Sequence, residues 1–264
     1  MQNRYVGDVG DYGKYALLRH LCGSDKCEFI RLAVVWCLFP DETFNNDGKH
    51  ISYLRNRNFA KLDPDLHGAL NLIVSQGRRH VSSVPESRCL PPSAIFFTQP
   101  VLVTRDTQTG PAERIRYRNA WLHECLHQTR NCEVVFFDPD NGLETPSVPK
   151  HHPKAGKYIY WDELALFWNR GDTLLIYHHL NRIVPAARQI QVLKLRFAAV
   201  FDRAAIVPLV FRRGSSRVFW LVHRGDVLGR ELESRAADLL RTGWSRHFQP
   251  FGWPSNDQVS THAG

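Results

Sequence analysis

The sequence of 264 residues contains no apolar run long enough to cross a lipid bilayer. Its opening residues, 1–5, lead directly into a polar, glycine-containing segment and not into the apolar core of a secretion signal. Internal repeats and low-complexity linkers are also lacking. These absences speak against the membrane-spanning and secreted classes, and we expect a cytoplasmic protein with no membrane partner.

Closely spaced cysteine pairs are lacking too. The six cysteines include no Cys-x-x-Cys motif, so the sequence does not indicate a zinc ribbon, and their scatter over a long chain does not indicate a disulfide framework. We therefore expect reduced thiols, in keeping with a cytoplasmic location. The cysteines are Cys22, Cys27, Cys37, Cys89, Cys125 and Cys132.

Hydrophobic residues make up 43% of the chain, which is enough for a sizeable core. The length and the alternation of strand-like and helical patterns predict a single α/β domain over residues 1–252. Within it, residues 78–111 are proline-rich and irregular, and we interpret them as an insertion or a lid. Residues 253–264 are expected to form a flexible tail.

Acidic residues are fewer than basic residues, 26 against 34, so the formal net charge is +8 and the isoelectric point is about 9.3. Such an excess favours an anionic partner, most simply nucleic acid, although a basic surface can also serve solubility alone. The composition gives no indication of the oligomeric state.

One stretch carries the strongest functional signal. The run EVVFF at 133–137 is typical of a buried parallel strand, and it breaks into Asp138, Pro139, Asp140 and Asn141, followed by a glycine. In open α/β sheets, ligands bind in the crevice at the carboxyl ends of the strands. The same residue types also form ordinary solvated turns. We favour a catalytic site, because similar polar loops follow other predicted strands.

A second polar loop, residues 40–50, follows the first predicted strand at 29–39. Near the N-terminus, three glycines at 7–13 let the backbone approach a ligand, or they only lead into a first helix that Asp11 caps. The candidate cofactor-binding residues of these two loops are Asp11, Lys14, Asp41, Glu42, Asn46 and Asp47.

A third polar cluster follows the predicted strand at 173–177. His178 and His179 are candidate catalytic bases, although a single histidine in such a place can be structural. A β-hairpin with a tight, basic turn is predicted over 204–222. The candidate substrate contacts are Tyr177, Arg182, Arg212 and Arg213.

The order of these elements resembles that of the class I S-adenosylmethionine-dependent methyltransferases. In that family a mostly parallel sheet closes with an antiparallel hairpin, and the fourth strand carries the catalytic loop. The predicted strand at 30–39 corresponds to the first strand of the family, 134–137 to the fourth, 174–177 to the fifth and 204–222 to the closing pair. The resemblance covers residues 11–222. It implies a Rossmann-like sheet with helices on both faces and S-adenosylmethionine as the cofactor.

The sequence Asp138-Pro139-Asp140-Asn141 stands where adenine-N6 methyltransferases carry an Asp-Pro-Pro-aromatic tetrapeptide. In that motif, the acid and the prolyl carbonyl hold the target amine. Only the first two residues match. The missing aromatic residue would have to be replaced by Tyr177 or Trp161 as the stacking partner of a base.

A further departure follows the first predicted strand, where the family has a glycine-rich turn for the cofactor. Residues 40–48 contain one glycine and three acids instead. This loop could bind the cationic sulfonium and the ribose of the cofactor through Asp41, Glu42 or Asp47.

The acidic loops also allow a second chemistry. Asp41, Asp47, Asp138 and Asp140 would form a Mg²⁺ site if the strands that precede them are neighbours. Such a metal could activate water for phosphodiester hydrolysis, with one of the two histidines after strand 173–177 as the proton shuttle. The alternative function is therefore a magnesium-dependent nuclease.

A third hypothesis is a nucleic-acid-binding module without catalytic activity, because one fold hosts many functions. Both enzyme hypotheses require that residues 41–47, 138–144 and 178–182 gather in one hollow.

Overall fold

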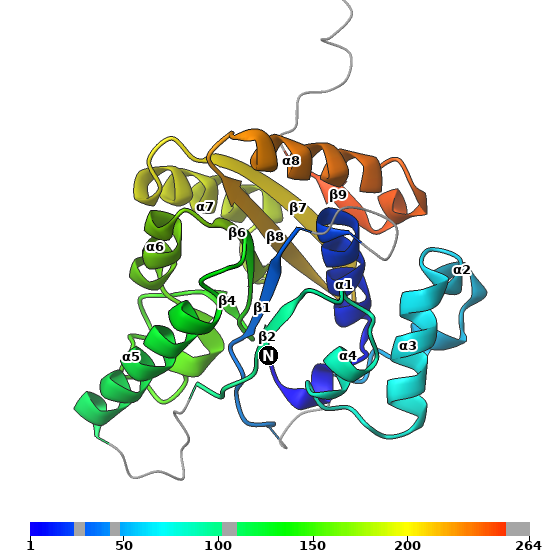
Figure 1. Cartoon of the computed structure of the whole chain (residues 1–264), viewed down its shortest axis with the longest axis horizontal. Coiled ribbons are helices and arrows are strands. Elements are labelled where there is room, and N and C mark those ends of the chain that lie inside the picture. The colour runs from blue at the N-terminus through cyan, green and yellow to red at the C-terminus, as the bar shows by residue number, and fades with distance from the viewer. Residues whose placement is uncertain (24–29, 43–47, 102–109, 252–264) are drawn as a thin grey trace, which may run out of the picture.

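The computed structural model describes residues 1–23, 30–42, 48–101 and 110–251. In this part of the chain, a seven-stranded mixed sheet has the order β2-β1-β3-β6-β8-β7-β9 (Figure 1). Its strands are β1 (Leu32–Trp36), β2 (Ile95–Phe97), β3 (Val134–Asp138), β6 (Thr173–His179), β7 (Ala205–Arg213), β8 (Ser215–His223) and β9 (Phe248–Pro250). A separate pair joins β4 (Gly142–Leu143) to β5 (Tyr158–Ile159).

The core of the sheet is parallel and one edge is antiparallel. Strands β2, β1, β3 and β6 pair in parallel, whereas β8 runs antiparallel to both β6 and β7, and β9 is antiparallel to β7. The prediction of an α/β protein with a parallel centre and a closing hairpin is confirmed. The antiparallel part is larger than the sequence indicated, because β9 adds a third strand beyond the hairpin.

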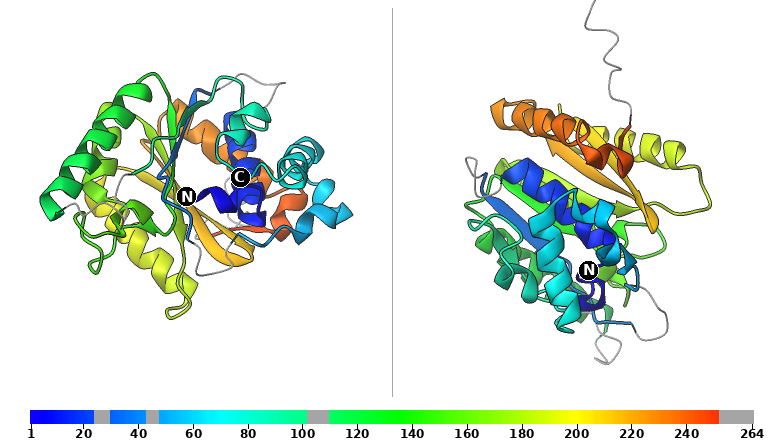
Figure 2. Two further views of the ribbon diagram at one scale, coloured as in Figure 1. Left: turned by 90° about the horizontal axis from the view of Figure 1, so that it is seen from below. Right: turned by 90° about the vertical axis from the view of Figure 1, so that its right-hand side faces the viewer.

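Helices cover both faces of the sheet (Figures 1 and 2). One face is covered by α1 (Val9–Cys22), α3 (Pro64–Ser75) and α8 (Val227–Leu239), and the other by α5 (Pro111–Gln128), α6 (Trp161–Arg170) and α7 (Ala186–Val200). The shorter helices are η1 (Asn3–Tyr5), η2 (Ser52–Arg55), α2 (Arg57–Ala60), α4 (Ser83–Glu86), η3 (Ala155–Lys157) and η4 (Gly243–Arg246). Among the described residues, no helix combines the length and the apolarity that crossing a membrane requires.

The two central strands, β1 and β3, are apolar at nearly every position because helices bury both of their faces. Alternate side chains enter two separate cores. Val34 and Phe136 pack on the face of α1, whereas Val35 and Phe137 pack on the face of α5 and α6. The register pairs Trp36 with Asp138, so both strands end at the same edge of the sheet.

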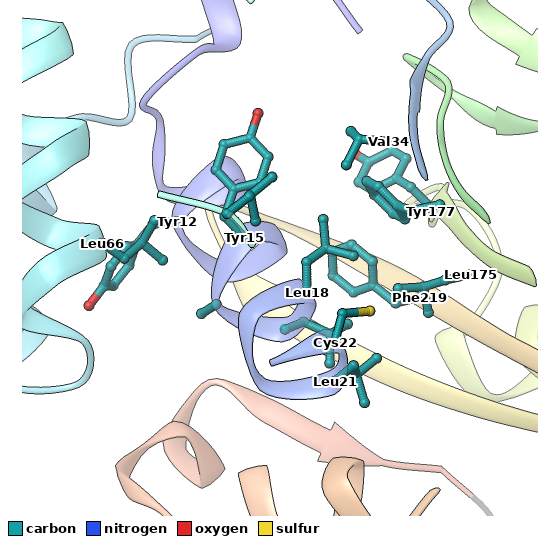
Figure 3. Packing of buried hydrophobic residues seen from close by; sticks show 14 of the residues in the cluster. Tyr12, Tyr15, Leu18, Leu21, Cys22, Val34, Leu66, Leu175, Tyr177 and Phe219 are labelled. Carbon is teal, nitrogen blue, oxygen red and sulfur yellow. The ribbon is translucent and has the colours of Figure 1, made fainter. Parts of the chain in front are cut away.

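Helix α1 lies against the sheet and is buried along almost its whole length. Figure 3 shows Leu18 and Leu21 packing toward Phe219 and Leu175 of the sheet, while Tyr12 points to α3. The helix is capped by Asp8, whose carboxylate accepts the backbone N–H of Asp11 at 2.9 Å. The expectation that Asp11 is the capping residue was therefore wrong, and its carboxylate is available for other contacts.

The segment predicted as an insertion or a lid contributes α4 and the edge strand β2, which pairs with β1 through Ala33 and Ile95. Residues 102–109 of this segment and the predicted tail at 253–264 lie outside the described residues.

Candidate functional site

A cavity of about 560 Å³ opens at the carboxyl edge of the parallel strands. Its walls come from α1, from the loops after β1, β3 and β6, and from the turn between β7 and β8. Strand β1 has β2 on one side and β3 on the other, so the strand order reverses at this edge. That reversal point is where α/β sheets bind ligands.

The cavity brings together most of the residues that the sequence indicated. The loops after β1 and β3 and the first turns of α1 converge here, as the parallel arrangement requires. The predicted site residues that line the cavity are Asp11, Lys14, Glu42, Asp138, Pro139, Asp140, Asn141, Tyr177, His179 and Arg182.

Lys14 joins two of these acids in a buried ionic cluster. Its Nζ lies 2.7 Å from Asp11 Oδ1 and 2.6 Å from Asp138 Oδ2, and the three side chains are at most 5% exposed. Burial alone would lower the pKa of Lys14, but the two carboxylates raise it, so the ammonium stays charged. Burial raises the pKa of Asp11 to about 6, although Lys14 opposes that shift. The cluster holds the Asp138 side chain beside the cavity.

A second ionic cluster lies on the β1 side of the cavity. Lys157 Nζ lies 2.6 Å from Glu42 Oε2 and 3.1 Å from Asp140 Oδ2. The amide of Gln2 also donates to Asp140 at 2.7 Å. Burial would raise the pKa of Asp140, but nearby positive charge, including Lys157, and the hydrogen bonds lower it below its ordinary value. Asp140 is therefore an ionised acceptor with a fixed position.

The first two residues of the sequence fill the gap between the ends of β1 and β3. The amine of Met1 donates to Cys37 O at 3.0 Å and to Asp138 O at 3.2 Å. Gln2 is fully buried between the two strand ends, and Glu42 N donates to its side-chain oxygen at 2.9 Å. The open cavity therefore lies beside this gap, on the α1 face of the sheet. Neither residue was predicted to belong to the site.

Strands β6 and β8 supply the other wall of the cavity. Tyr177 Oη and His179 Nδ1 are 3.3 Å apart, and both residues face α1 because they are two positions apart on β6. Burial raises the pKa of Tyr177 to about 12, so its hydroxyl stays protonated. Arg217 of β8 is the register partner of His179 and also lines the cavity. Arg217 was not among the residues predicted to contact the substrate.

His178 does not line the cavity. Adjacent residues on a strand point to opposite faces, so His178 and His179 cannot both enter it. Nδ1 of His178 accepts the backbone N–H of Leu143 at 3.1 Å, and burial lowers the pKa of the ring to about 4. The position of His178 is that of a neutral, structural histidine.

Three other selected residues that the structure describes lie outside the cavity. Asp41 accepts the backbone N–H of Arg4 at 3.2 Å. Arg212 is exposed, and Arg213 donates to His247 at the rim of a second, smaller hollow. The remaining two, Asn46 and Asp47, lie outside the described residues.

The donor set of the cavity suits a polar organic ligand better than a bare metal. In the described part of the chain, no group of three or more His, Cys, Asp or Glu side chains could hold a metal ion. Two lysine ammonium groups already lie where a cation would bind the four acids Asp11, Asp138, Glu42 and Asp140.

Neither a protein-family model nor a curated protein nor a solved structure matches this chain. Its function is therefore argued from the site.

Proposed function

We propose that the protein is a class I methyltransferase-like enzyme that transfers a methyl group to an amine of a nucleic acid base. The observation that carries this proposal is the arrangement of strands around the cavity. Strand β3, which corresponds to the fourth strand of that family, lies between β1 and β6, which correspond to the first and fifth. The hairpin of β7 and β8 closes the sheet next to β6, and the loop after β3 faces the cavity.

The cavity is compatible with S-adenosylmethionine. Small-molecule sites typically enclose about 300–1,000 Å³, and this cavity of about 560 Å³ lies within that range. When bound, the cofactor would supply an electrophilic methyl group on a cationic sulfonium. Asp8, which also lines the cavity and has no ion-pair partner among the described residues, is an acid that could lie near that charge.

The fixed position of the loop after β3 supports a role in holding a target amine. The backbone N–H of Asn141 donates to Lys157 O at 2.9 Å, and the backbone N–H of His179 donates to Asn141 O at 3.1 Å. These bonds fix the loop between β6 and η3. We assign the Asp138 carboxylate and the Pro139 carbonyl to accept hydrogen bonds from the amine, which directs its lone pair into the cavity.

Lys14 would then act by holding Asp138 and not by contacting the base. Tyr177, which also lines the cavity, would be the stacking partner for the base. Its ring already meets Phe219 edge-on, with 5.9 Å between the ring centroids, so its orientation is fixed. The net charge of +8 supports a nucleic acid as the carrier of the base.

The magnesium-dependent nuclease has less support, because Lys14 and Lys157 neutralise the acids that would ligate the metal. A binding module without activity would use the same cavity. The transfer assay described below distinguishes this hypothesis from that of an enzyme.

The experiment is a thermal-shift titration followed by a transfer assay. We expect S-adenosylhomocysteine to raise the melting temperature through its binding to the folded state, whereas Mg²⁺ alone does not. Radiolabelled methyl groups should pass from S-adenosylmethionine to RNA or DNA, and Asp138→Asn, which removes the charged acceptor, should reduce this transfer. Asp202→Asn, at an exposed position after α7, is the matched control. No shift with S-adenosylhomocysteine, together with nucleic acid cleavage that EDTA stops, would replace this proposal with the nuclease.

A further inference from the structure

We propose that the end of the cavity next to β8 is a phosphate subsite in which Arg217 binds a phosphate group of a nucleotide or a polynucleotide. This inference rests on the proposed function for the nature of the substrate. The binding of phosphate by Arg217 can nevertheless be tested without methyl transfer.

Arg217 is a buried cation without a carboxylate partner. Its side chain is 8% exposed, and none of the described acids lies within ion-pair distance of it. Its Nη2 donates to Ser215 Oγ at 2.8 Å and, at 3.4 Å, to Arg213 O. Its buried Nε has no hydrogen-bond partner. The Nε atom has almost no accessible surface, so the donors left for a ligand are those of Nη1, which forms no hydrogen bond with a described residue at the wall of the open cavity.

The other buried cations of the described residues are paired. Lys14 bridges two aspartates, Lys157 bridges Glu42 and Asp140, and Arg118 lies 2.5 Å from Glu163. Pairing is the usual condition for burying a charge, because an isolated buried charge costs several kcal/mol. The exception at Arg217 is explained if its counter-charge is a ligand that enters the cavity.

Helix α1 leaves room for this guanidinium. A Cβ atom at Gly10, in the first turn of the helix, would lie 1.8 Å from Arg217 Nη1. Any side chain at position 10 would thus displace the arginine. The first turn of α1 also presents the positive end of the helix dipole to the same cavity, which favours an anion there. Of the two acids in this turn, Asp11 is paired with Lys14, and the carboxylate of Asp8 caps the helix and forms no ion pair with Arg217.

Further hydrogen-bond donors line the same cavity as Arg217. His179 is opposite it in the register of β6 and β8, and Ser215 lies at the turn of the hairpin. Arg182, in the loop after β6, lines the same cavity. An arginine fork binds two oxygens of a phosphate at once, and several donors around it match a group with three terminal oxygens better than a carboxylate.

The spacing agrees with a nucleotide whose base reaches the loop after β3. Strands β3 and β8 are separated by β6 alone, and Arg217 is level with His179, two residues beyond Tyr177, which is level with Asp138. Two strand spacings of about 4.8 Å and two residues of about 3.3 Å each place the backbone of Arg217 about 12 Å from that of Asp138. That separation is on the scale of one nucleotide, from its phosphate to the edge of its base. Tyr177, on the strand between them, would lie beside the ligand.

The test compares Arg217→Gln with the wild-type chain in binding titrations. The probes are adenosine 5′-monophosphate, adenosine, inorganic phosphate, acetate and a fluorescent single-stranded oligonucleotide. We expect Arg217→Gln to weaken binding of adenosine 5′-monophosphate by about tenfold or more, and to leave adenosine binding unchanged. Arg188→Gln, at an exposed position of α7, should bind every probe as the wild type does. Arg217→Lys keeps the charge and loses the fork, so it should give an intermediate loss.

Two arms identify the source of the phosphate. The ligand is a polynucleotide if Arg217→Gln binds the oligonucleotide more weakly and if the slope of the logarithm of the binding constant against the logarithm of salt concentration decreases in magnitude by about one. If only the mononucleotide responds, the ligand is a free nucleotide. The inference is overturned if Arg217→Gln and Arg217→Lys, both shown to be folded by their melting curves, bind the phosphate probes as the wild type does. It is also overturned if acetate is the probe whose binding is lost.

The outcome is separable from that of the methyltransferase proposal. Loss of phosphate binding in Arg217→Gln without any response of the wild type to S-adenosylhomocysteine would support the subsite and refute methyl transfer. A response to S-adenosylhomocysteine with phosphate binding independent of Arg217 would do the reverse.

Discussion

Replacing Lys14 with methionine removes the cation shared by Asp11 and Asp138. The ammonium is bonded to both carboxylates, and the three side chains are at most 5% exposed. Methionine fills a similar volume, so the main effect is to leave two carboxylates buried without a counter-charge. Breaking a buried ion pair in this way costs about 3–5 kcal/mol. Against a typical total stability of about 5–15 kcal/mol, this loss is large.

The loss should depend on pH in a defined direction. Without Lys14, the pKa of the Asp11 carboxyl, which burial already raises to about 6, rises further above its value in the unfolded chain. The folded variant then binds more protons than the unfolded one, so its stability falls as the pH rises through this interval. We expect a larger difference from the wild type at pH 8 than at pH 5, because protonation at pH 5 relieves part of the uncompensated charge.

The measurement is urea unfolding at pH 5 and pH 8, with the fluorescence of the seven tryptophans as the signal that monitors unfolding. With a slope of about 2–3 kcal/mol per molar urea, the midpoint should fall by about 1–2 M at pH 8. Lys194→Met, at an exposed position of α7, should change the stability by less than about 0.5 kcal/mol. The variant that combines Lys14→Met with Asp11→Asn and Asp138→Asn should recover much of the loss. A loss below about 1 kcal/mol, or the same loss at both pH values, would refute the reasoning.

Three further predictions follow from individual side chains. His178 has a folded-state pKa of about 4, below its value of 6.5 in the unfolded chain, so it contributes stability at neutral pH that is lost as the pH falls between these values. In urea titrations, His178→Asn should reduce the loss of unfolding free energy between pH 7 and pH 5 by at most about 2 kcal/mol. The same pH dependence of the unfolding free energy in the variant and the wild type would contradict this role. Gly142→Ala should lower the melting temperature far more than Gly77→Ala. Both glycines have a positive φ, of 116° and 67°, but a Cβ at Gly142 would lie 2.8 Å from the backbone of His178, whereas the space at Gly77 is open. Equal changes in melting temperature would argue against this close contact. Burial raises the pKa of the Cys22 and Cys37 thiols to about 12, so neither should react with a thiol reagent at pH 8 until urea unfolds the protein.

The fold class could be predicted because the central strands are buried on both faces. Such strands must be apolar throughout, so the runs that became β1, β3 and β6 are visible in the sequence without knowledge of their neighbours. The convergence of Glu42 and Asp138 follows from the same arrangement, since the carboxyl ends of parallel strands meet at one edge. These inferences needed only local patterns and one rule of sheet geometry.

The contacts that join separate walls of the cavity could not be predicted in this way, because they join residues that are distant in the chain. The cation that pairs with Asp138 comes from α1, and Lys157 reaches Glu42 across more than a hundred residues. Local sequence carries no signal for such partners.

The adjacent histidines show the limit most simply. The residue type makes both histidines candidate catalytic bases, but the alternation of side chains on a strand allows only one of them to enter the cavity. Which one enters depends on the face that α1 covers, and this is set by the packing of the whole sheet. Arg217 is the converse case, because it is an ordinary arginine in the sequence of β8. Its lack of a carboxylate within ion-pair distance exists only once the chain is folded, when Lys14 and Lys157 pair with four of the acids of the cavity.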